Sequence, residues 1–503
     1  MANNPFLYDA SVREEQRRAS LARARRVVWL RRTAVTALFL AAAAAVVVAV
    51  VTRPDHRFHR GSVPFAPCRI RLVAAQCGRL AVPEDPRRPG SRRISLRIAV
   101  IPATKQPAAG ALFYLAGGPG GAASADVPAV DQLFGEVAST RDLVLVDQRG
   151  TGGSHRLSCP PTSIRPEQTN AVAAYVRRCF TRLGRRTRLY TTAVAADDLE
   201  AVRRALGYDR IDVYGASYAA TAAQVYLRLH PRSVRTVTLD GGSLLGVPLY
   251  ESLAPNAERA LRAQLARCRA APACRRAFPR TRPELAQLLE RAPQRVEAFG
   301  RAVTIDADAV ASTVHALSLE ADGVALIPQV LQRAAGGDYV PLAQEYVDRV
   351  GVGLDARARL AMSFTILCSE PWARFDPGRV RKASAGSYLA RVAEARAELF
   401  ARACRFVPKG VVPAASTRLV PTQVPVLVLA GGADPQDPPG NVRGWRRYFP
   451  RGKLVVVRGA THGVLAEGCV ALVTAQFVAS GATRGLDTSC VRRIEQPPFE
   501  TGG

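Results

Sequence analysis

Short apolar runs that end in glycine or in a turn recur along this chain, and helical patterns separate them. The runs cover residues 111–116, 143–146, 211–214, 234–239, 424–429 and 454–457. Continuous apolar runs of this length are typical of strands that are buried on both faces of a sheet. An alternating run at 94–101 indicates one more strand, and the segment 194–206, with acids early and arginines late, indicates a helix. The repetition predicts an α/β fold with a mostly parallel central sheet.

A long segment between residues 250 and 417 interrupts this repetition. Its pattern is nearly all helical, with segments rich in Arg, Ala, Leu and Glu that Pro and Gly separate. A chain of 503 residues has room for such an inserted domain. We expect a helical cap over the C-terminal edge of the sheet, between a first core part at 68–249 and a second core part at 418–503.

The N-terminal region has the pattern of an export segment. Eight arginines precede an uncharged apolar run at 33–52. A run of about 20 residues suits one membrane crossing, and positive charge ahead of it places the rest of the chain outside the membrane. The expected parts are a basic cytoplasmic leader (1–32), a transmembrane signal-anchor (33–52) and a linker (53–67). The alternative is a signal peptide that is cleaved among the small residues 41–49, which would make the protein secreted.

The ten cysteines agree with an exported body. An even number of cysteines in an exported protein predicts disulfides. The sequence leaves their connectivity open, and the simplest expectation pairs neighbours along the chain, as Cys68–Cys77, Cys159–Cys179, Cys268–Cys274, Cys368–Cys404 and Cys469–Cys490. Neither a CxxC pair nor an HExxH string is present, so we expect no metal site.

The strongly basic charge does not indicate a nucleic-acid partner. The formal net charge of +29 comes almost entirely from arginine, and aromatic residues make up only 6% of the chain. Nucleic-acid binding needs clustered basic and stacking residues, which this sequence lacks. We expect no nucleic-acid partner, and only a general attraction to anionic surfaces.

The string VYGASYAATAA at 213–223 passes from an apolar strand into an alanine-rich helix through Ser217. Small residues surround this serine, as a tight turn between strand and helix requires. In that setting a serine is lifted clear of the sheet and acts as a nucleophile, and the N–H of the next residue, Tyr218, faces the oxyanion. The alternative is a serine that only begins a helix.

A serine nucleophile needs a base and an acid that orients the base, here expected in the chain order Ser, Asp, His. Asp434 follows the strand at 424–429, and His462 follows the strand at 454–457. Both therefore lie in loops at strand ends, where a catalytic triad must assemble. Asp437 and Asp240 remain the rival acids.

Acyl transfer also needs a second donor for the oxyanion. The string LAGGPGG at 115–121 follows an early strand and leaves backbone N–H groups able to approach a ligand. We expect Gly118 to be this donor, with Gly117 as the alternative. Asp147 and Arg149, in VDQRGTGGS, are expected to brace the neighbouring loop.

Five motifs in order resemble the α/β-hydrolase family of prolyl iminopeptidases and secreted tripeptidyl aminopeptidases: GGPGG, VLVDQRGTGGS, DVYGASYAA, GGADPQDPP and ATHGV. The resemblance spans about residues 68–490. It implies an α/β-hydrolase fold with a cap, Ser217 as nucleophile, His462 as base and Asp434 as acid. Prolyl iminopeptidases commonly carry a histidine where this chain has Ala116, and the elbow ends in Ala219 rather than glycine. These departures leave the acyl chemistry intact, but they weaken the case for carrying the proline specificity of the family over to this chain.

An exopeptidase must recognise a free α-ammonium group, for which a carboxylate is the simplest partner. The string ILCSEPW at 366–372 offers Glu370 beside Cys368. Relatives in the resembled family use cap acids in this role. Trp372 is a candidate to line the same pocket. The alternatives are a Glu370 that caps a helix and a Trp372 that fills the core of the cap.

The sequence therefore predicts an exported, membrane-tethered serine hydrolase that releases residues from peptide N-termini through an acyl-enzyme. Its partners are peptides with a free N-terminus and the membrane, and no cofactor is expected. One alternative is an esterase or lipase with the same triad. The other is a catalytically silent protein that binds the cell envelope.

Overall fold

The computed structural model describes residues 60–88, 90–160, 169–351, 354–370 and 376–502. The expected leader, the expected membrane segment and most of the expected linker lie outside these residues. Within the described part of the chain, no helix is both long enough and apolar enough to cross a membrane. The first strand begins at Phe65, so the folded body starts inside the segment that the sequence assigned to the linker.

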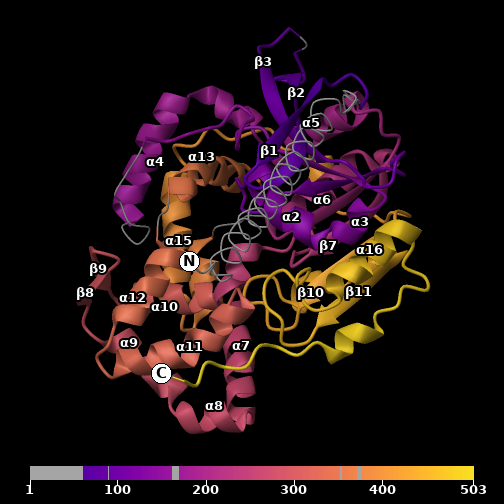
Figure 1. Cartoon of the computed structure of the whole chain (residues 1–503). Helices are drawn as coiled ribbons and strands as arrows, with labels where there is room; N and C mark the ends of the chain where they lie inside the picture. The colour runs from indigo at the N-terminus through magenta and orange to yellow at the C-terminus, as the bar shows by residue number, and fades with distance from the viewer. Residues whose placement is uncertain (1–59, 89, 161–168, 352–353, 371–375, 503) are drawn as a thin grey trace, which may run out of the picture. The chain divides into compact units, whose positions relative to one another are not determined.

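A nine-stranded sheet forms the core, in the order β1-β2-β3-β5-β4-β6-β7-β10-β11 (Figure 1). Its strands are β1 Phe65–Ile70, β2 Val73–Pro83, β3 Arg93–Ile101, β4 Ala111–Leu115, β5 Asp142–Val146, β6 Ile211–Ala216, β7 Val234–Asp240, β10 Val426–Gly431 and β11 Gly452–Val457. The strands from β5 to β11 pair in parallel, and β1, β2 and β3 add antiparallel pairs at one side. Every expected strand is present, and the mostly parallel sheet is confirmed.

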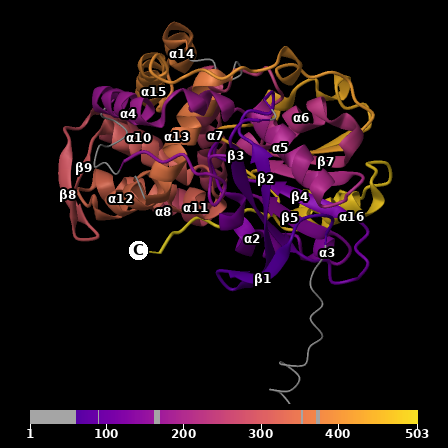
Figure 2. The same cartoon turned by 90° about the horizontal axis from the view of Figure 1, so that it is seen from above.

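Helices cover both faces of this sheet. They are α2 Val127–Leu133, α3 Gly135–Ala138, α5 Thr192–Ala205, α6 Tyr218–Leu229 and α16 Val470–Ser480. The helices α5 and α6 lie on one face, and α2, α3 and α16 lie on the other (Figure 2). The hydroxyl of Thr191 accepts a hydrogen bond from the N–H of Val194, which caps α5 where the sequence predicts a helix.

The insertion between β7 and β10, called the cap below, is mostly helical. Its helices are α7 Leu249–Ala270, α8 Pro272–Ala277, α9 Thr281–Glu290, α10 Ala307–Leu317, α11 Ala321–Ala335, α12 Val340–Glu345, α13 Leu354–Ser369, α14 Pro377–Ser384 and α15 Ala390–Ala403. Most of them share a hydrophobic core of their own. The cap also contains an antiparallel hairpin, β8 Gln294–Ala298 and β9 Arg301–Ile305, which the helical pattern did not predict. Its strands are mostly exposed, so they carry no apolar alternation.

The cap also receives a helix from the first core part. Helix α4, Thr169–Leu183, packs against α15 and α13 rather than against the sheet (Figure 1). Its apolar residues Val176 and Phe180 are buried in a cluster with Phe364 and Phe400. Helix α4, which precedes residue 249 in the chain, thus packs with helices of the cap.

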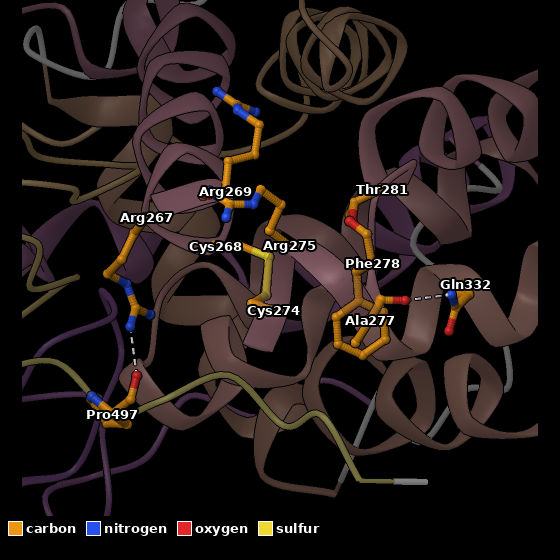
Figure 3. Close-up of a disulfide and its surroundings, with 10 residues drawn as sticks. All are labelled: Arg267, Cys268, Arg269, Cys274, Arg275, Ala277, Phe278, Thr281, Gln332 and Pro497. Carbon is orange, nitrogen blue, oxygen red and sulfur yellow. Dashed lines mark hydrogen bonds between the residues drawn. A yellow bond between two sulfur atoms is a disulfide. The ribbon is translucent and has the colours of Figure 1, made fainter. Parts of the chain in front are cut away.

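All five expected disulfides are present: Cys68–Cys77, Cys159–Cys179, Cys268–Cys274, Cys368–Cys404 and Cys469–Cys490. Each joins neighbours along the chain, with sequence separations between 6 and 36 residues. Figure 3 shows Cys268–Cys274, which fixes the end of α7 to α8. The disulfides of the folded body thus join segments that are close together in the sequence.

The C-terminal tail crosses from the second core part to the cap. Arg267 on α7 donates a hydrogen bond to the carbonyl of Pro497 at 2.5 Å (Figure 3). The same guanidinium lies 4.2 Å from the ring centroid of Phe499, and that ring is buried in the core of the cap. The N–H of Glu500 donates to the carbonyl of Ala325. These contacts attach the C-terminal tail, which continues from the second core part, to the cap.

Candidate active site

Ser217 occupies the turn between β6 and α6. Its backbone has φ 58° and ψ −128°, a conformation that is strained for a residue with a side chain. The N–H of Ser217 donates to the carbonyl of Asp240 at 2.9 Å, which holds the turn against the end of β7. A methyl group added at Gly215 would lie 2.2 Å from the carbonyl oxygen of Ala219, so the turn requires glycine there. This geometry is that of a nucleophile elbow.

The elbow accommodates alanine at position 219, where the usual motif has glycine. Ala219 is buried and lies in the first turn of α6. The tight contact is made by Ala220, since a methyl group added at Gly242 would lie 2.3 Å from the Ala220 side chain. The departure from glycine at the end of the motif therefore leaves the turn intact.

His462 and Asp434 form a hydrogen-bonded pair at the ends of β11 and β10. Nδ1 of His462 lies 2.9 Å from Oδ2 of Asp434. Asp434 is 1% exposed, and its Oδ1 accepts hydrogen bonds from the N–H groups of Gln436 and Asp437 at 2.8 and 2.9 Å. These backbone donors fix the carboxylate, and the carboxylate fixes the imidazole.

The carboxylates around His462 favour its charged form. Burial of the ring opposes that form, but the charge and hydrogen bond of Asp434, with smaller effects of Asp437 and Asp240, raise the pKa of His462 to about 9. The ring of His462 is therefore mostly protonated at neutral pH, and its neutral form, which can accept a proton, increases as the pH approaches 9.

The two rival acids are engaged with other partners. Asp240 accepts hydrogen bonds from the hydroxyl of Tyr214 and from the N–H groups of Val464 and Leu465, at 2.7, 2.8 and 3.0 Å. Asp437 accepts a hydrogen bond of 2.5 Å from Ser243. Asp240 thus braces the loop that carries His462, and Asp434 is the acid that contacts the ring.

Adjacent glycines bring the elbow, the acid loop and the base loop together. A methyl group added at Gly241 would lie 2.8 Å from the N of Gly463 and 3.5 Å from Oδ2 of Asp434. One added at Gly242 would lie 3.4 Å from the carbonyl oxygen of Ser217. The end of β7 is therefore the point on which the three loops converge.

The glycine-rich loop after β4 lies beside Ser217. A methyl group added at Gly117 would lie 3.8 Å from Cβ of Ser217, and the N–H of Gly121 closes the loop on the carbonyl of Gly117 at 3.0 Å. Gly118 has φ +128°, which favours glycine at that position. The hydroxyl of Tyr218 lies 2.9 Å from the hydroxyl of Thr192, so the side chain of Tyr218 reaches the first turn of α5.

Asp147 and Arg149 brace this loop, as the sequence indicated. Asp147 accepts hydrogen bonds from the N–H and hydroxyl of Ser124 and from the N–H of Gly153, at 2.8, 3.0 and 2.8 Å. Arg149 is completely buried and pairs with Asp198.

A family model described as the alpha/beta hydrolase fold matches residues 111–468. The chain belongs to this family. Among named relatives, a tripeptidyl aminopeptidase of Streptomyces coelicolor is 31% identical over 186 residues, which are 33% of this chain and 34% of the relative. The serine protease Hip1 of Mycobacterium tuberculosis is 30% identical over 204 residues, which are 36% of this chain and 39% of the relative. The α/β-hydrolase chain thus matches little more than a third of the length of either relative.

A solved structure, the proline iminopeptidase of Mycobacterium smegmatis, is similar over 80% of this chain and 98% of its own. The two share 18% sequence identity with a TM-score of 0.36.

The α/β-hydrolase core meets the cap at the glycine-rich loop. A methyl group added at Gly120 would lie 2.8 Å from the carbonyl oxygen of Arg359 on α13. The hydroxyl of Ser363, also on α13, donates to the carbonyl of Pro119 at 2.7 Å. Helix α13 therefore lies directly over the loop that carries the expected oxyanion donor.

Glu370 follows α13 and is buried against the first turn of α5. Its Oε1 accepts a hydrogen bond from the N–H of Thr192 at 2.9 Å. Glu370 therefore caps α5, which is one of the two expected roles, and it does so while buried. Burial raises the pKa of the Tyr218 phenol, and the negative charge of Glu370 nearby raises it further. Trp372 lies outside the described residues.

Two polar side chains beside the triad were not anticipated. The amide of Gln436 lies 3.5 Å from Nε2 of His462. His315, on α10, has a buried Nδ1 without a hydrogen-bond partner among the described residues. Burial, then Arg396 and His462, lower the pKa of His315 to about 3 against the opposing effect of Asp434, so this ring is neutral at physiological pH. Gln436 stands within the quoted acid-loop motif, whereas nothing in the helical pattern marks His315.

Proposed function

We propose that this α/β hydrolase is a serine aminopeptidase that releases one or a few residues from peptide N-termini. The observation that carries the proposal is the convergence, at the end of β7, of the strained turn at Ser217 with the loops of the hydrogen-bonded pair His462 and Asp434. This arrangement supplies a nucleophile, a base and an acid that orients the base. The names of the two relatives, an aminopeptidase and a serine protease, favour a peptide substrate.

In the proposed reaction, Oγ of Ser217 attacks the scissile carbonyl carbon while Nε2 of His462 takes the hydroxyl proton. The N–H groups of Tyr218 and Gly118 hold the oxyanion of the tetrahedral intermediate, and one such donor contributes about 3 kcal/mol. His462 then gives its proton to the leaving amine. Water attacks the acyl-enzyme with His462 again as base, which restores Ser217.

Glu370 is the proposed partner of the free α-ammonium group. It carries a buried carboxylate between the first turn of α5 and the phenol of Tyr218, the residue that follows the nucleophile. A charged hydrogen bond to an ammonium group is strong in such a place. The location of Glu370 would limit cleavage to bonds near the N-terminus. Trp372 stays a proposed wall of the same pocket.

Export is part of the proposal. The five disulfides of the folded body favour an oxidising compartment. The apolar segment 33–52 would tether the protein to the membrane with its catalytic part outside, or would be removed as a signal peptide.

The test uses the full chain, produced under oxidising conditions, on paired fluorogenic peptides with free and with N-acetylated ends. Short-chain esters and a Ser217→Ala variant complete the set. The proposal predicts cleavage of the free-amine peptides alone, lost in the variant. Turnover of esters without any peptide would assign an esterase, and a folded wild-type protein without any activity would favour a silent binding protein.

A further inference from the structure

The loops that carry the acid and the base are attached to the cap as well as to the core. The N–H of His462 donates to the carbonyl of Leu319, in the turn after α10, at 3.2 Å. The side-chain amide of Asn256 on α7 donates to the carbonyl of Gln436 in the acid loop at 3.1 Å. The backbone around the triad therefore depends on the placement of two cap elements.

One side chain joins these attachments. Gln264 lies on α7 and is 3% exposed. Its Nε2 donates to the carbonyl of Ser318 at 3.2 Å and to the carbonyl of Ala433 at 3.3 Å. Ser318 precedes Leu319, which accepts from His462, and Ala433 precedes Asp434. A single amide thus connects the turn that holds the base to the loop that carries the acid.

The chemistry of this position calls for a neutral side chain with two donors on one nitrogen. Ser318 and Ala433 are both buried, so their carbonyl groups need partners inside the protein. A hydroxyl offers one proton, and an ammonium would bring a buried charge beside His462. Asparagine has the same amide but is one methylene shorter. Glutamine meets each of these requirements.

We propose that Gln264 is a positioning residue that sets the distance between Asp434 and His462 from the cap. On this proposal the cap helps to position the loops of Asp434 and His462, and it does not move independently of them. The inference rests on the proposed serine chemistry, but not on the choice of peptide as substrate.

A positioning role makes a specific kinetic prediction. Loss of the amide should shift the two loops relative to each other without touching the substrate, so kcat should fall while KM stays within about twofold. A displacement of the catalytic groups by about 1 Å costs up to about 100-fold in rate. Because Asp434 raises the pKa of His462, a looser pair should also move the rising limb of the pH–rate profile to lower pH.

The experiment compares the full-length wild type with Gln264→Met, which keeps the length and removes both donors. Gln332→Met is the control, since Gln332 is an exposed cap glutamine whose amide donates to the carbonyl of Ala277 at 2.9 Å (Figure 3). The readouts are the rate of covalent labelling by a fluorophosphonate, which needs the activated serine but no peptide recognition, together with kcat, KM and the pH profile. Gln264→Asn serves if Gln264→Met does not fold, as thermal unfolding will show.

The inference predicts a labelling rate about 10- to 100-fold lower in Gln264→Met, a shifted pH profile, and wild-type values in Gln332→Met. A Gln264→Met protein that folds and labels at the wild-type rate would overturn it, and so would a change confined to KM. If the wild type labels but cleaves no peptide, the proposed function fails while the labelling comparison still decides the inference.

Discussion

Both carboxylate oxygens of Asp198 accept hydrogen bonds from the guanidinium of Arg149, at 2.6 and 2.7 Å, in a buried ion pair. Arg149 also donates to the backbone carbonyls of Glu84 and Leu189. It thus ties the end of β2, the loop beside the oxyanion turn and helix α5 into one unit.

Replacement of Arg149 by methionine leaves the Asp198 charge buried without its partner. We predict a loss of about 3–5 kcal/mol in the free energy of unfolding, measured by denaturant titration. The double variant Arg149→Met, Asp198→Leu should recover part of that loss because it removes the second charge as well. Equal stability of the single variant and the wild type would contradict this assignment.

The elbow predicts opposite outcomes at two neighbouring positions. Gly215→Ala places a methyl group against the backbone of Ala219 and should lower kcat by about 100-fold or more. Ala219→Gly restores the usual motif and should keep activity while it costs about 1 kcal/mol of helix stability. Kinetics and thermal unfolding of both variants provide the test, and an active Gly215→Ala enzyme would refute the strained turn.

If His462 is the base, as proposed, its pKa of about 9 sets the pH dependence of the reaction. The base must be neutral to accept the Ser217 proton, so kcat/KM should rise with pH through about 9. The α-amino group of a peptide loses its charge above a pKa of about 8, so peptides should show a maximum between these values while esters keep rising. The profile is measured between about pH 6 and pH 10. A wild-type midpoint near the ordinary histidine value of about 6.5 would speak against the raised pKa.

Glu370→Gln keeps an acceptor for the N–H of Thr192 but removes the charge. We predict a KM that is about tenfold higher for free-amine peptides, because a charged hydrogen bond becomes neutral, and an unchanged rate of fluorophosphonate labelling. Glu290→Gln, exposed at the end of α9, is the control and should behave as wild type. A Glu370→Gln enzyme with an unaltered KM would leave Glu370 with its helix-capping role alone.

The Cys368–Cys404 disulfide fastens the end of α13, next to Glu370, to the end of α15. Its sequence separation of 36 residues implies about 3–4 kcal/mol of stabilisation, which replacement by two alanines should remove along with tight peptide binding. Loss of Cys268–Cys274, with a separation of 6, should cost about 2 kcal/mol and leave KM unchanged. Calorimetry and peptide kinetics check both, and an equal effect of the two pairs on KM would contradict the link to the site.

The sequence predicts the sheet and the triad loops well because their signals are local. The strands β4, β5 and β10 are buried along their whole length or nearly so, and each reads as an apolar run. Asp434 and His462 stand in the loops that follow β10 and β11, two neighbouring parallel strands, so their convergence is a consequence of parallel topology.

The features that the sequence did not predict depend on contacts between distant segments. The hairpin β8–β9 is mostly exposed and lacks an apolar face. Helix α4 has an ordinary amphipathic pattern, which does not tell whether its partner is the sheet or α15. Gln264 stands 169 residues before its acceptor Ala433, and in the sequence it is one more polar residue on a charged helix.

The central claim is that Ser217 is the nucleophile, and identification of the covalently modified residue tests it most directly. The full-length protein is treated with a fluorophosphonate, and the adduct is mapped by mass spectrometry of its peptides. The account predicts one adduct, on Ser217, absent from Ser217→Ala and slower to form in Asp434→Asn. A folded protein that forms no adduct, or forms it on another residue, would contradict the account.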